Sequence, residues 1–573
     1  MGISMGINGT ERIASATTFE IVRPDTLATG VVVQMSDHPT EKETSMTQLS
    51  RSHVKSSFLL IAVSLTITLL GFGPAAIGQE GNGESSDDWF IKSDKDRNEK
   101  LQTGIKGGEK RDIIPSLPGM PIPQSERIKP PSPDYLLGKV KWGSGAIIGK
   151  ELTEDWNLAP NDMLEFHKRA RAKGFKYMPT QTSLAEFSYD PALMPAILLG
   201  GVREVKFTPT VINKLRQYVL DGGMIVCDSV YGSPWFYESS LEVFDDMFPE
   251  SRFRVLPPDH PLYHITSDID QVTYQSGGEG EKGKPFFEGL YIGSRIGVLV
   301  SKYGLGCGLA GKMDIFDQLE ARGLKPKAYS EQSARQIGEN LAPYIVGYGR
   351  VGEAEGKAEL FGAIDQNAPT SEFTFAQVKH DGHWNAHPGA ARQLLTRLEK
   401  DSAIPVNLKR VSVDLERDDT SAWPFLFFTG LDDFVLTARQ IRALRRHVNQ
   451  GGTLVINNGL GLATFHQAAV REMRRVFPAD EFRLLPQTHE IFSSLHTVSR
   501  VKYTPTLMKD QGAKLQGRPV LFGVKVAGKL RVIYSPYDLE GGWNEVRYPL
   551  SRGYQSDSAK KLGSNIIMYA MTH

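Results

Sequence analysis

Residues 196–229 read AILLGGVREVKFTPTVINKLRQYVLDGGMIVCDS and predict a strand, a helix and a second strand in immediate succession. The apolar run Ala196–Leu199 has the length of a buried strand, and Met224–Cys227 is a second such run. Between them, apolar residues recur at helical spacing over Thr208–Leu220. Gly222 follows this helix, where a residue with left-handed backbone is expected. A strand–helix–strand unit with short turns closes right-handed into a parallel sheet.

The same pattern occurs a second time in the chain. Residues 425–458 read FLFFTGLDDFVLTARQIRALRRHVNQGGTLVINN and align onto 196–229 without a gap, at an offset of 229 positions. So many matches in one register show that the chain carries one domain twice. The matching pairs include Thr208 and Thr437, Gly222 and Gly451, Phe236 and Phe465, Arg254 and Arg483, His260 and His489, Tyr274 and Tyr503, and, upstream, Trp156-Asn157 and Trp384-Asn385.

Each copy is predicted to be an open α/β sheet of parallel strands with helices on both faces. An antiparallel region is expected later in each copy, over Gly289–Val300 and Val520–Ile533, where alternating residues replace the helical pattern. We assign the first copy to residues 135–350 and the second to 371–573, with a linker over 351–370. A face-to-face, pseudo-twofold pair that covers parts of both sheet edges is one arrangement open to them.

Residues 46–78 carry a targeting signal. Phe58–Leu70 reads FLLIAVSLTITLL, an uncharged apolar run that follows a basic segment and precedes small residues up to Gly78. This order describes a secretory signal peptide, with cleavage after Gly78. An uncleaved membrane anchor over 56–78 is the alternative, since about 20 apolar residues span a bilayer. Both predict an exported protein, either periplasmic or anchored to the outer side of the cytoplasmic membrane.

The residues on either side of this signal have no domain character. Residues 1–45 resemble neither a signal nor a folded segment, so we expect Met46 to be the true start and 1–45 to be a wrongly assigned or disordered extension. Residues 79–134 are polar and then rich in proline. Low hydrophobicity followed by closely spaced prolines is typical of a linker.

The composition narrows the classes of function. Of 573 residues, 40% are hydrophobic and 23% are charged, as in ordinary globular proteins. Lys+Arg and Asp+Glu both number 66, so no net charge attracts nucleic acid, and no nucleic-acid partner is expected. The two cysteines, Cys227 and Cys307, supply neither a disulfide scaffold nor a cysteine-rich zinc site. No metal or cofactor is predicted.

The features that recur in both copies resemble the bacterial family called domain of unknown function 4159. They are a Trp near the start, the helix–Gly-Gly–strand step, Phe-Pro before a Leu-Pro…His segment, and a Tyr near the end. That family is similar in fold to the class I glutamine amidotransferases and their non-catalytic relatives. The resemblance therefore implies a flavodoxin-like core in each copy.

Neither cysteine has the setting of an amidotransferase nucleophile, which stands on a sharp turn beside a base. No glycines flank Cys227 at the end of its strand, and its counterpart in the second copy is Ile456, so a buried core position is predicted. Cys307 lies between two glycines, which predicts a turn.

Short polar or small residues end the central strands of each copy. Asp228-Ser229 and Asn457-Asn458 end one strand, and Gly201 and Gly430 end the preceding one. Ligands of open α/β sheets collect outside the carboxyl ends of the strands, so these six residues are candidates for ligand binding. Alternatively, they only turn the chain there. Only the first copy keeps a carboxylate, so a general acid–base role would belong to Asp228.

Two further pairs complete the ligand-binding candidates: His260 with His489, and Trp156 with Trp384. A histidine can act as a general base, or it can fix its own loop through ring hydrogen bonds. A tryptophan can stack on a ligand or lie in the core. The catalytic candidates are Asp228 and His260.

Two functions are left open by the sequence. The first is a non-catalytic binding or assembly module, whose partner is a cell-envelope protein or a small-molecule ligand. The second is a hydrolase or carbohydrate-processing enzyme that uses Asp228 and His260 of the first copy. Geometry separates them, because the enzyme needs Asp228, His260 and Trp156 to converge on an open pocket.

Overall fold

The computed structural model describes residues 135–358 and 372–573, apart from positions 144, 149–150, 186–188, 278–279, 314–315, 322 and 479–480. The predictions for residues 1–45, 46–78 and 79–134, and for most of the linker over 351–370, lie outside this part of the chain. Within it, no helix combines the length and the apolar character that crossing a membrane requires.

The first repeat is built on a seven-stranded mixed sheet. The first five strands run parallel, and the last two are antiparallel to their neighbours. Across the sheet the order is β4 (Tyr177–Ser183), β1 (Tyr135–Lys141), β5 (Ala196–Gly201), β6 (Met224–Ser229), β11 (Arg295–Ser301), β10 (Phe287–Ile292) and β7 (Phe253–Val255).

The second repeat has the same sheet, in the order β14 (Val406–Val413), β13 (Phe373–Val378), β15 (Phe425–Gly430), β16 (Thr453–Asn458), β19 (Lys529–Ser535), β18 (Phe522–Val526) and β17 (Arg483–Leu484). The predicted antiparallel region is therefore confirmed, and each sheet is mixed with mostly parallel strands. A tight turn at Gly293-Ser294 joins β10 to β11, and so short a connection permits only an antiparallel return.

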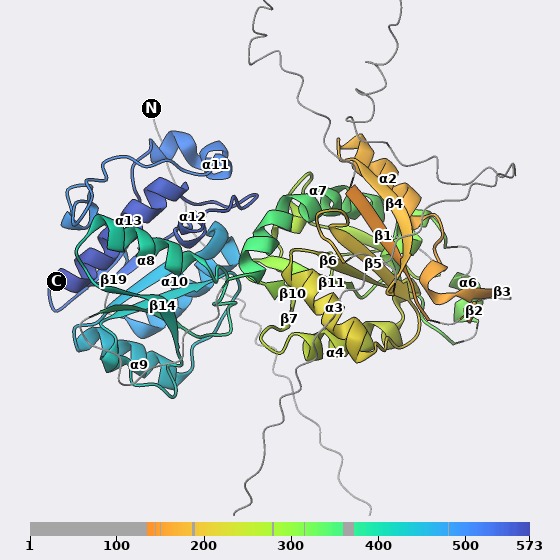
Figure 1. Cartoon of the computed structure of the whole chain (residues 1–573), viewed down its shortest axis with the longest axis horizontal. Helices are drawn as coiled ribbons and strands as arrows, with labels where there is room; N and C mark the ends of the chain where they lie inside the picture. Colours follow the sequence, from red (N-terminus) through yellow and green to blue (C-terminus); the bar gives the residue numbers. More distant parts are fainter. Residues whose placement is uncertain are drawn as a thin grey trace, which may run out of the picture. The chain divides into compact units, whose positions relative to one another are not determined.

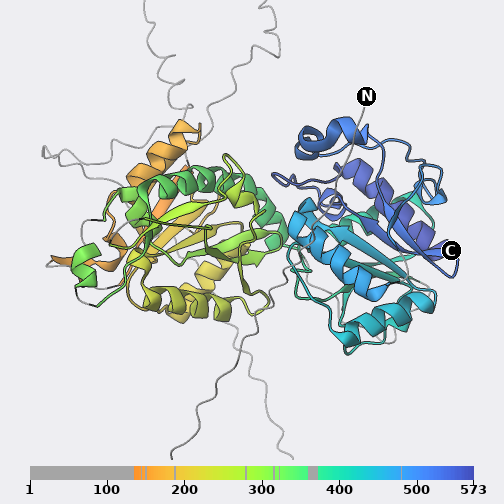
Figure 2. The ribbon, with the colours of Figure 1, turned by 180° about the vertical axis from the view of Figure 1, so that it is seen from behind.

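Helices cover both faces of each sheet, as Figures 1 and 2 show. In the first repeat, one layer contains α2 (Asp162–Ala172), α5 (Leu305–Ala310) and α7 (Glu331–Gly356), and the other contains α3 (Pro209–Leu220) and α4 (Pro234–Met247). In the second repeat, the layers are α8 (Ala390–Asp401), α12 (Glu540–Trp543) and α13 (Ser556–Thr572), and opposite them α9 (Ala438–Asn449) and α10 (Ala463–Val476).

Smaller elements lie outside these layers. They are the hairpin of β2 (Gly145–Ile148) and β3 (Glu151–Glu154), the three-stranded sheet of β12 (Ala328–Tyr329), β8 (Val272–Gln275) and β9 (Glu281–Gly283), and the helices α6 (Phe316–Glu320) and α11 (Pro505–Leu515).

The strand–helix–strand unit forms for the reasons that its sequence indicates. Alternate residues of β6 face opposite layers, so Val226 packs under α2 and α7 while Cys227 packs under α3 and α4. Thr437 caps α9 by accepting a hydrogen bond from the Gln440 backbone, whose side chain reciprocates. Gly222 and Gly451 have φ angles of 109° and 98°, as predicted for the residue after each helix.

The second repeat packs the carboxyl edge of its sheet on the first repeat. Arg254, in β7, lies 3.7 Å from the Asp432 carboxylate and also donates a hydrogen bond to the Asp381 carbonyl. The backbone N–H and the hydroxyl of Thr464, in the first turn of α10, donate to the Asp259 carboxylate at 2.9 and 2.7 Å. The segment 254–259 of the first repeat is thus held by an ion pair at one end and by charge-assisted hydrogen bonds at the other.

The surfaces in this contact are not equivalent. The first repeat contributes β7, the turn before β11 and the end of α7, whereas the second contributes the segments after β13, β15, β16 and α12. Among the latter, Leu431, Leu460 and Leu462 join the hydrophobic core of the first repeat. The twofold pair is therefore wrong: the repeats meet head to tail, so only one of the two carboxyl edges is covered.

A buried ion cluster closes this contact. Glu355, near the end of α7, lies 3.2 Å from His387, which in turn lies 3.6 Å from Asp538. Glu355 also accepts hydrogen bonds from the Ser294 backbone at 2.8 Å and from the Tyr548 hydroxyl at 3.0 Å. Burial lowers the pKa of His387, but Asp538 and Glu355 raise it more, so that it rises to about 10. His387 also lowers the pKa of Asp538 below its usual value, against the effect of burial.

Replacing His387 with glutamine should destabilise the chain by about 3–5 kcal/mol near neutral pH, because two buried carboxylates lose their cation. The contribution of His387 is complete below its ordinary pKa of about 6.5 and is lost as the pH rises through about 10. The stability gap between the parent and H387Q should therefore shrink over this range.

Urea unfolding of the full chain at several pH values measures this gap. Lys357→Gln, at the exposed end of α7, is the matched control and should leave the unfolding midpoint unchanged. A gap that stays constant from pH 6 to pH 10 would show that His387 carries no charge in the folded chain.

Candidate functional site

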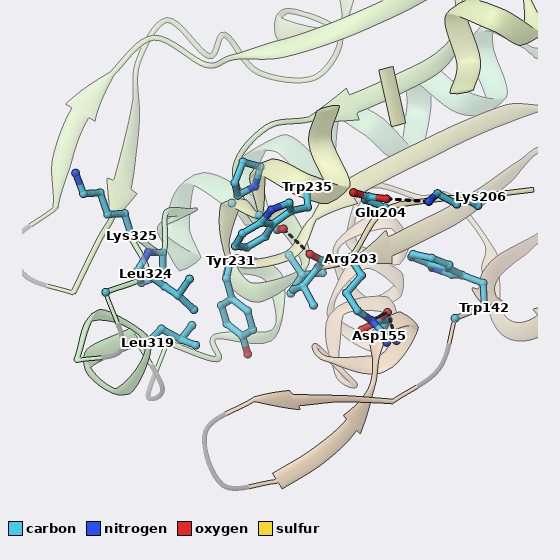
Figure 3. Close-up of a pocket in the computed structure, with 18 residues that line it drawn as sticks. Trp142, Asp155, Arg203, Glu204, Lys206, Tyr231, Trp235, Leu319, Leu324 and Lys325 are labelled. Carbon is cyan, nitrogen blue, oxygen red and sulfur yellow. Dashed lines mark hydrogen bonds and ion pairs between the residues drawn. The ribbon is translucent and has the colours of Figure 1, made fainter. Parts of the chain in front are cut away.

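A cavity of about 930 Å³ lies at the carboxyl edge of the first repeat's sheet (Figure 3). Its lining comes mainly from the segments that follow β1, β5 and β6. The strand order reverses here, because β4 lies on one side of β1 and β5 and β6 lie on the other. Ligands of open α/β sheets bind at such a reversal. The cavity therefore occupies the place that the sequence predicted for a site.

Aromatic side chains form much of its wall. The Trp142 ring packs on Phe236, with ring centroids 5.6 Å apart, and its indole N–H donates to the Gly200 carbonyl at 2.8 Å. Gly201 makes room for this ring, since a Cβ atom there would lie 2.4 Å from Trp142. Trp235, in the first turn of α4, is 54% exposed and offers an indole face to a ligand.

Charged side chains of both signs also line the cavity. Arg203 holds the Asp155 carboxylate at 2.6 Å in Figure 3, and Lys206 pairs with Glu204 at 3.0 Å. Burial raises the pKa of Asp155, although Arg203 opposes this shift. Lys325 lines the opposite side of the cavity in Figure 3. The lining thus carries three cations and two acids, a small excess of positive charge.

Asp228 serves the fold and not the cavity. Its buried carboxylate accepts hydrogen bonds from the backbone N–H groups of Leu305 and Gly306 at 2.6 and 2.8 Å, and so caps the start of α5. Burial raises the pKa of Asp228 to about 6, against the effect of these donors. The turn predicted around Cys307 is therefore wrong: this residue lies inside α5, whose first turn the carboxylate stabilises.

The two histidines fix their own loops. The Nδ1 atom of His260 accepts a hydrogen bond from the Leu262 backbone at 3.1 Å, and that of His489 accepts one from the Ile491 backbone at 3.2 Å. His260 is buried among aromatic rings that include Tyr291, and burial lowers its pKa to about 3. It is therefore neutral at physiological pH.

The catalytic candidates lie at opposite edges of the sheet. Asp228 pairs with Ser301 at the end of β11, whereas Tyr291, beside His260, pairs with Ile296 near its start. Five residues of a strand separate these levels by roughly 17 Å. Asp228 and His260 therefore do not meet in one pocket.

The other candidates hold structural positions. Ser229 and Gly430 are fully enclosed, and Asn458 donates a hydrogen bond to the Pro536 carbonyl at 3.0 Å. Asn457 accepts from the Leu539 backbone at 2.8 Å and donates to Thr429 and Asp538. Trp156 is buried with Lys141 over its ring, and Lys379 lies over Trp384 in the same way. Cys227 is buried in the core, as predicted.

In the described part of the second repeat, the corresponding edge is filled by the chain itself. His380 takes the place of Trp142 and contacts the carbonyl of Thr429, which corresponds to Gly200, at 2.7 Å. The following turn folds back so that the Gly382 carbonyl accepts hydrogen bonds from Leu431 and Asp432. The contact with the first repeat then covers this edge.

Three of the residues predicted from the repeated sequence adjoin the cavity, but the residues that line it were not predicted. Asp155, Val202 and Val230 line it and adjoin the candidates Trp156, Gly201 and Ser229. The missed residues differ between the copies: Trp142, Arg203, Tyr231 and Trp235 correspond to His380, Asp432, Leu460 and Thr464. The residues that line the cavity are therefore marked in the sequence by differences between the copies and not by identity.

The model of one protein family, Domain of unknown function (DUF4159), matches residues 139–346 and 374–571. The chain belongs to the DUF4159 family. Each match covers one repeat, so both repeats are DUF4159 domains. No curated protein matches the chain. Within the described residues, no cluster of three histidine, cysteine or acidic side chains is arranged to hold a metal ion.

Replacing Asp228 with asparagine in the first DUF4159 domain should change how stability depends on pH. The folded-state pKa of about 6 lies above the ordinary value of 3.8, so the folded chain retains this proton while the unfolded chain loses it. The parent should therefore lose about 2 kcal/mol between pH 4 and pH 6 relative to D228N, and about 3 kcal/mol in all once the pH has passed 7.

Denaturant unfolding of both chains across this range measures the difference. Asp246→Asn, on the exposed face of α4, is the control and should track the parent at every pH. A parent and D228N that respond identically to pH would contradict the assigned role of this carboxyl group.

Proposed function

We propose that this chain is an exported, non-catalytic binding module that holds its ligand in the cavity of the first repeat. The observation that carries the proposal is the position of this large aromatic cavity at the strand-order reversal. Convergent polar groups within an otherwise apolar pocket are typical of binding sites. The second repeat, whose own edge is covered, acts in this proposal as a rigid support.

The buried polar groups favour binding over hydrolysis. A hydrolase would need a general acid or base within hydrogen-bond reach of its substrate. Asp228 and His260 are enclosed, bonded to backbone groups and at opposite edges of the sheet. Burial also raises the pKa of Cys227 and Cys307, which keeps both thiols protonated.

The strand order supports a finer assignment of the fold. Numbered by their order in the chain, the five parallel strands of the first repeat lie as 2-1-3-4-5. This is the order of flavodoxin-like folds. We therefore propose a flavodoxin-like core similar to that of class I glutamine amidotransferases, without their nucleophile.

Ligand binding can be tested by thermal unfolding of the full chain against sugars, nucleotides, metal ions and peptidoglycan fragments. A ligand at a hundredfold excess over its Kd should stabilise the parent by about 2.7 kcal/mol. Trp235→Ala should abolish this effect, because it removes the most exposed aromatic wall.

Leu193→Ala is the control, since this side chain is 56% exposed and does not line the cavity. It should respond to the ligand like the parent. Equal stabilisation of W235A would place the ligand elsewhere. Turnover of a substrate that D228N loses while remaining folded would favour the hydrolase.

Export is proposed from the signal over residues 46–78 and can be tested separately. Expression of the full chain in a bacterium should yield a mature protein that begins at Gln79 and lies outside the cytoplasm. Leu60→Arg, which charges the apolar run, should leave the precursor uncleaved inside the cell. Mass spectrometry of the N-terminus of the parent distinguishes a cleaved signal peptide from an uncleaved anchor. The anchor would keep its N-terminal segment in the membrane.

A further inference from the structure

The two repeats present the same surface in two states, open in the first and occupied in the second. At the shared offset, Arg203, Tyr231 and Trp235 correspond to Asp432, Leu460 and Thr464. Tyr231 and Leu460 even share a left-handed backbone, with φ angles of 57° and 52°. The segments around the cavity therefore have matching backbones in both repeats, and the second shows what such a surface holds.

Part of what covers this surface in the second repeat is a polypeptide segment of this same chain, residues 254–259. Its first residue, Arg254, meets Asp432, and its last, Asp259, accepts two hydrogen bonds from Thr464. Leu460 packs into the hydrophobic core behind it. The segment thus meets this surface through a charged residue at each end, and the residues between the two ends are apolar.

The first repeat carries a positive charge at the position where the surface of the second repeat is negative. Arg203 stands where the second repeat has Asp432, and it remains 43% exposed beside its partner Asp155. Lys206 and Lys325 add to the positive lining. An occupant placed like residues 254–259 must therefore carry an acidic residue where Arg254 lies, because like charges oppose binding.

A second copy of this chain does not meet that requirement. The counterpart of Arg254 in the second repeat is Arg483, which is exposed and would face Arg203. The counterpart of Asp259 is Thr488, which has no carboxylate for the first turn of α4. Both differences disfavour a head-to-tail chain of copies, and like-charge contacts are a common means of such exclusion.

We propose that the cavity of the first repeat is a docking site for an acidic segment of a different protein. The segment places one carboxylate beside Arg203 and a second at the start of α4, by Trp235, with an apolar stretch between them. This inference rests on the proposed binding function and names the chemistry of the partner.

Two peptides test it directly. The probe has the sequence of residues 251–262 with Arg254→Glu, and the matched control keeps Arg254. The full-length parent should bind the probe at least tenfold more tightly than the control, measured by tryptophan fluorescence or calorimetry. Arg203→Asp should reverse this preference, since the cavity then carries the charge of Asp432.

A probe without advantage over the control on the parent, or an R203D chain that keeps the parent's preference, would overturn the proposal. Stabilisation by a small ligand that depends on Trp235 would in that case leave the proposed binding function standing. Peptide preference without any such ligand would instead confine the site to protein partners.

Self-association of the full chain supplies a second, independent measurement. Sedimentation should show that Arg203→Asp and Arg483→Glu each promote head-to-tail association about tenfold, because either change pairs opposite charges. The double variant should return to the behaviour of the parent. Stronger association of the parent than of both single variants would identify a second copy as the occupant and overturn the proposal.

Discussion

The head-to-tail contact between the repeats, closed by Glu355, His387 and Asp538, determines which parts of this molecule are accessible. Charges buried this deeply are tolerated only as a matched set, so the second repeat is held with its carboxyl edge against the first. Because the contact joins two different surfaces, it covers one carboxyl edge and leaves its twin open. The open aromatic cavity of the first repeat follows from this asymmetry.

The carboxylate that caps the helix after the last parallel strand lies at different positions in the two repeats, and the contact depends on this difference. In the first repeat, Asp228 alone caps the short helix that follows β11. In the second, Asn457 takes one backbone donor and Asp538 takes another, at a position where the first repeat has Gly304. Moving the negative charge from β16 to the next loop keeps the helix capped. It also brings a carboxylate to His387.

The surface around the cavity shows the complementary change. Leucines that bury against the first repeat correspond to Val202, Tyr231 and Ser233, and an acid that pairs with Arg254 corresponds to Arg203. Tyr231 and Ser233 make the open surface more polar, and Arg203 reverses its charge, so that it is less suited to the chain's own segment. The same scaffold thus forms an internal contact in one repeat and leaves an open cavity in the other, where we propose binding.

The sequence by itself determined the duplication, the strand–helix–strand units and the edge of the sheet where a cavity forms. Those features depend on local periodicity, on glycines after helices and on a register shared by both copies, all of which are readable along the chain. The antiparallel pairing of β7 and β10 was only partly visible, since strand partners are distant in sequence.

Tertiary structure alone decided which residues line the cavity and what the residues predicted as catalytic do. Asp228 and His260 looked catalytic because polar residues near strand ends often are, yet their partners are backbone groups that only the folded chain brings to them. Trp142, Arg203 and Trp235 carried no repeated signal, because the corresponding residues of the second repeat, His380, Asp432 and Thr464, lie at an edge that the first repeat covers. Residues shared by both copies maintain the common fold, and the differences set what each copy touches.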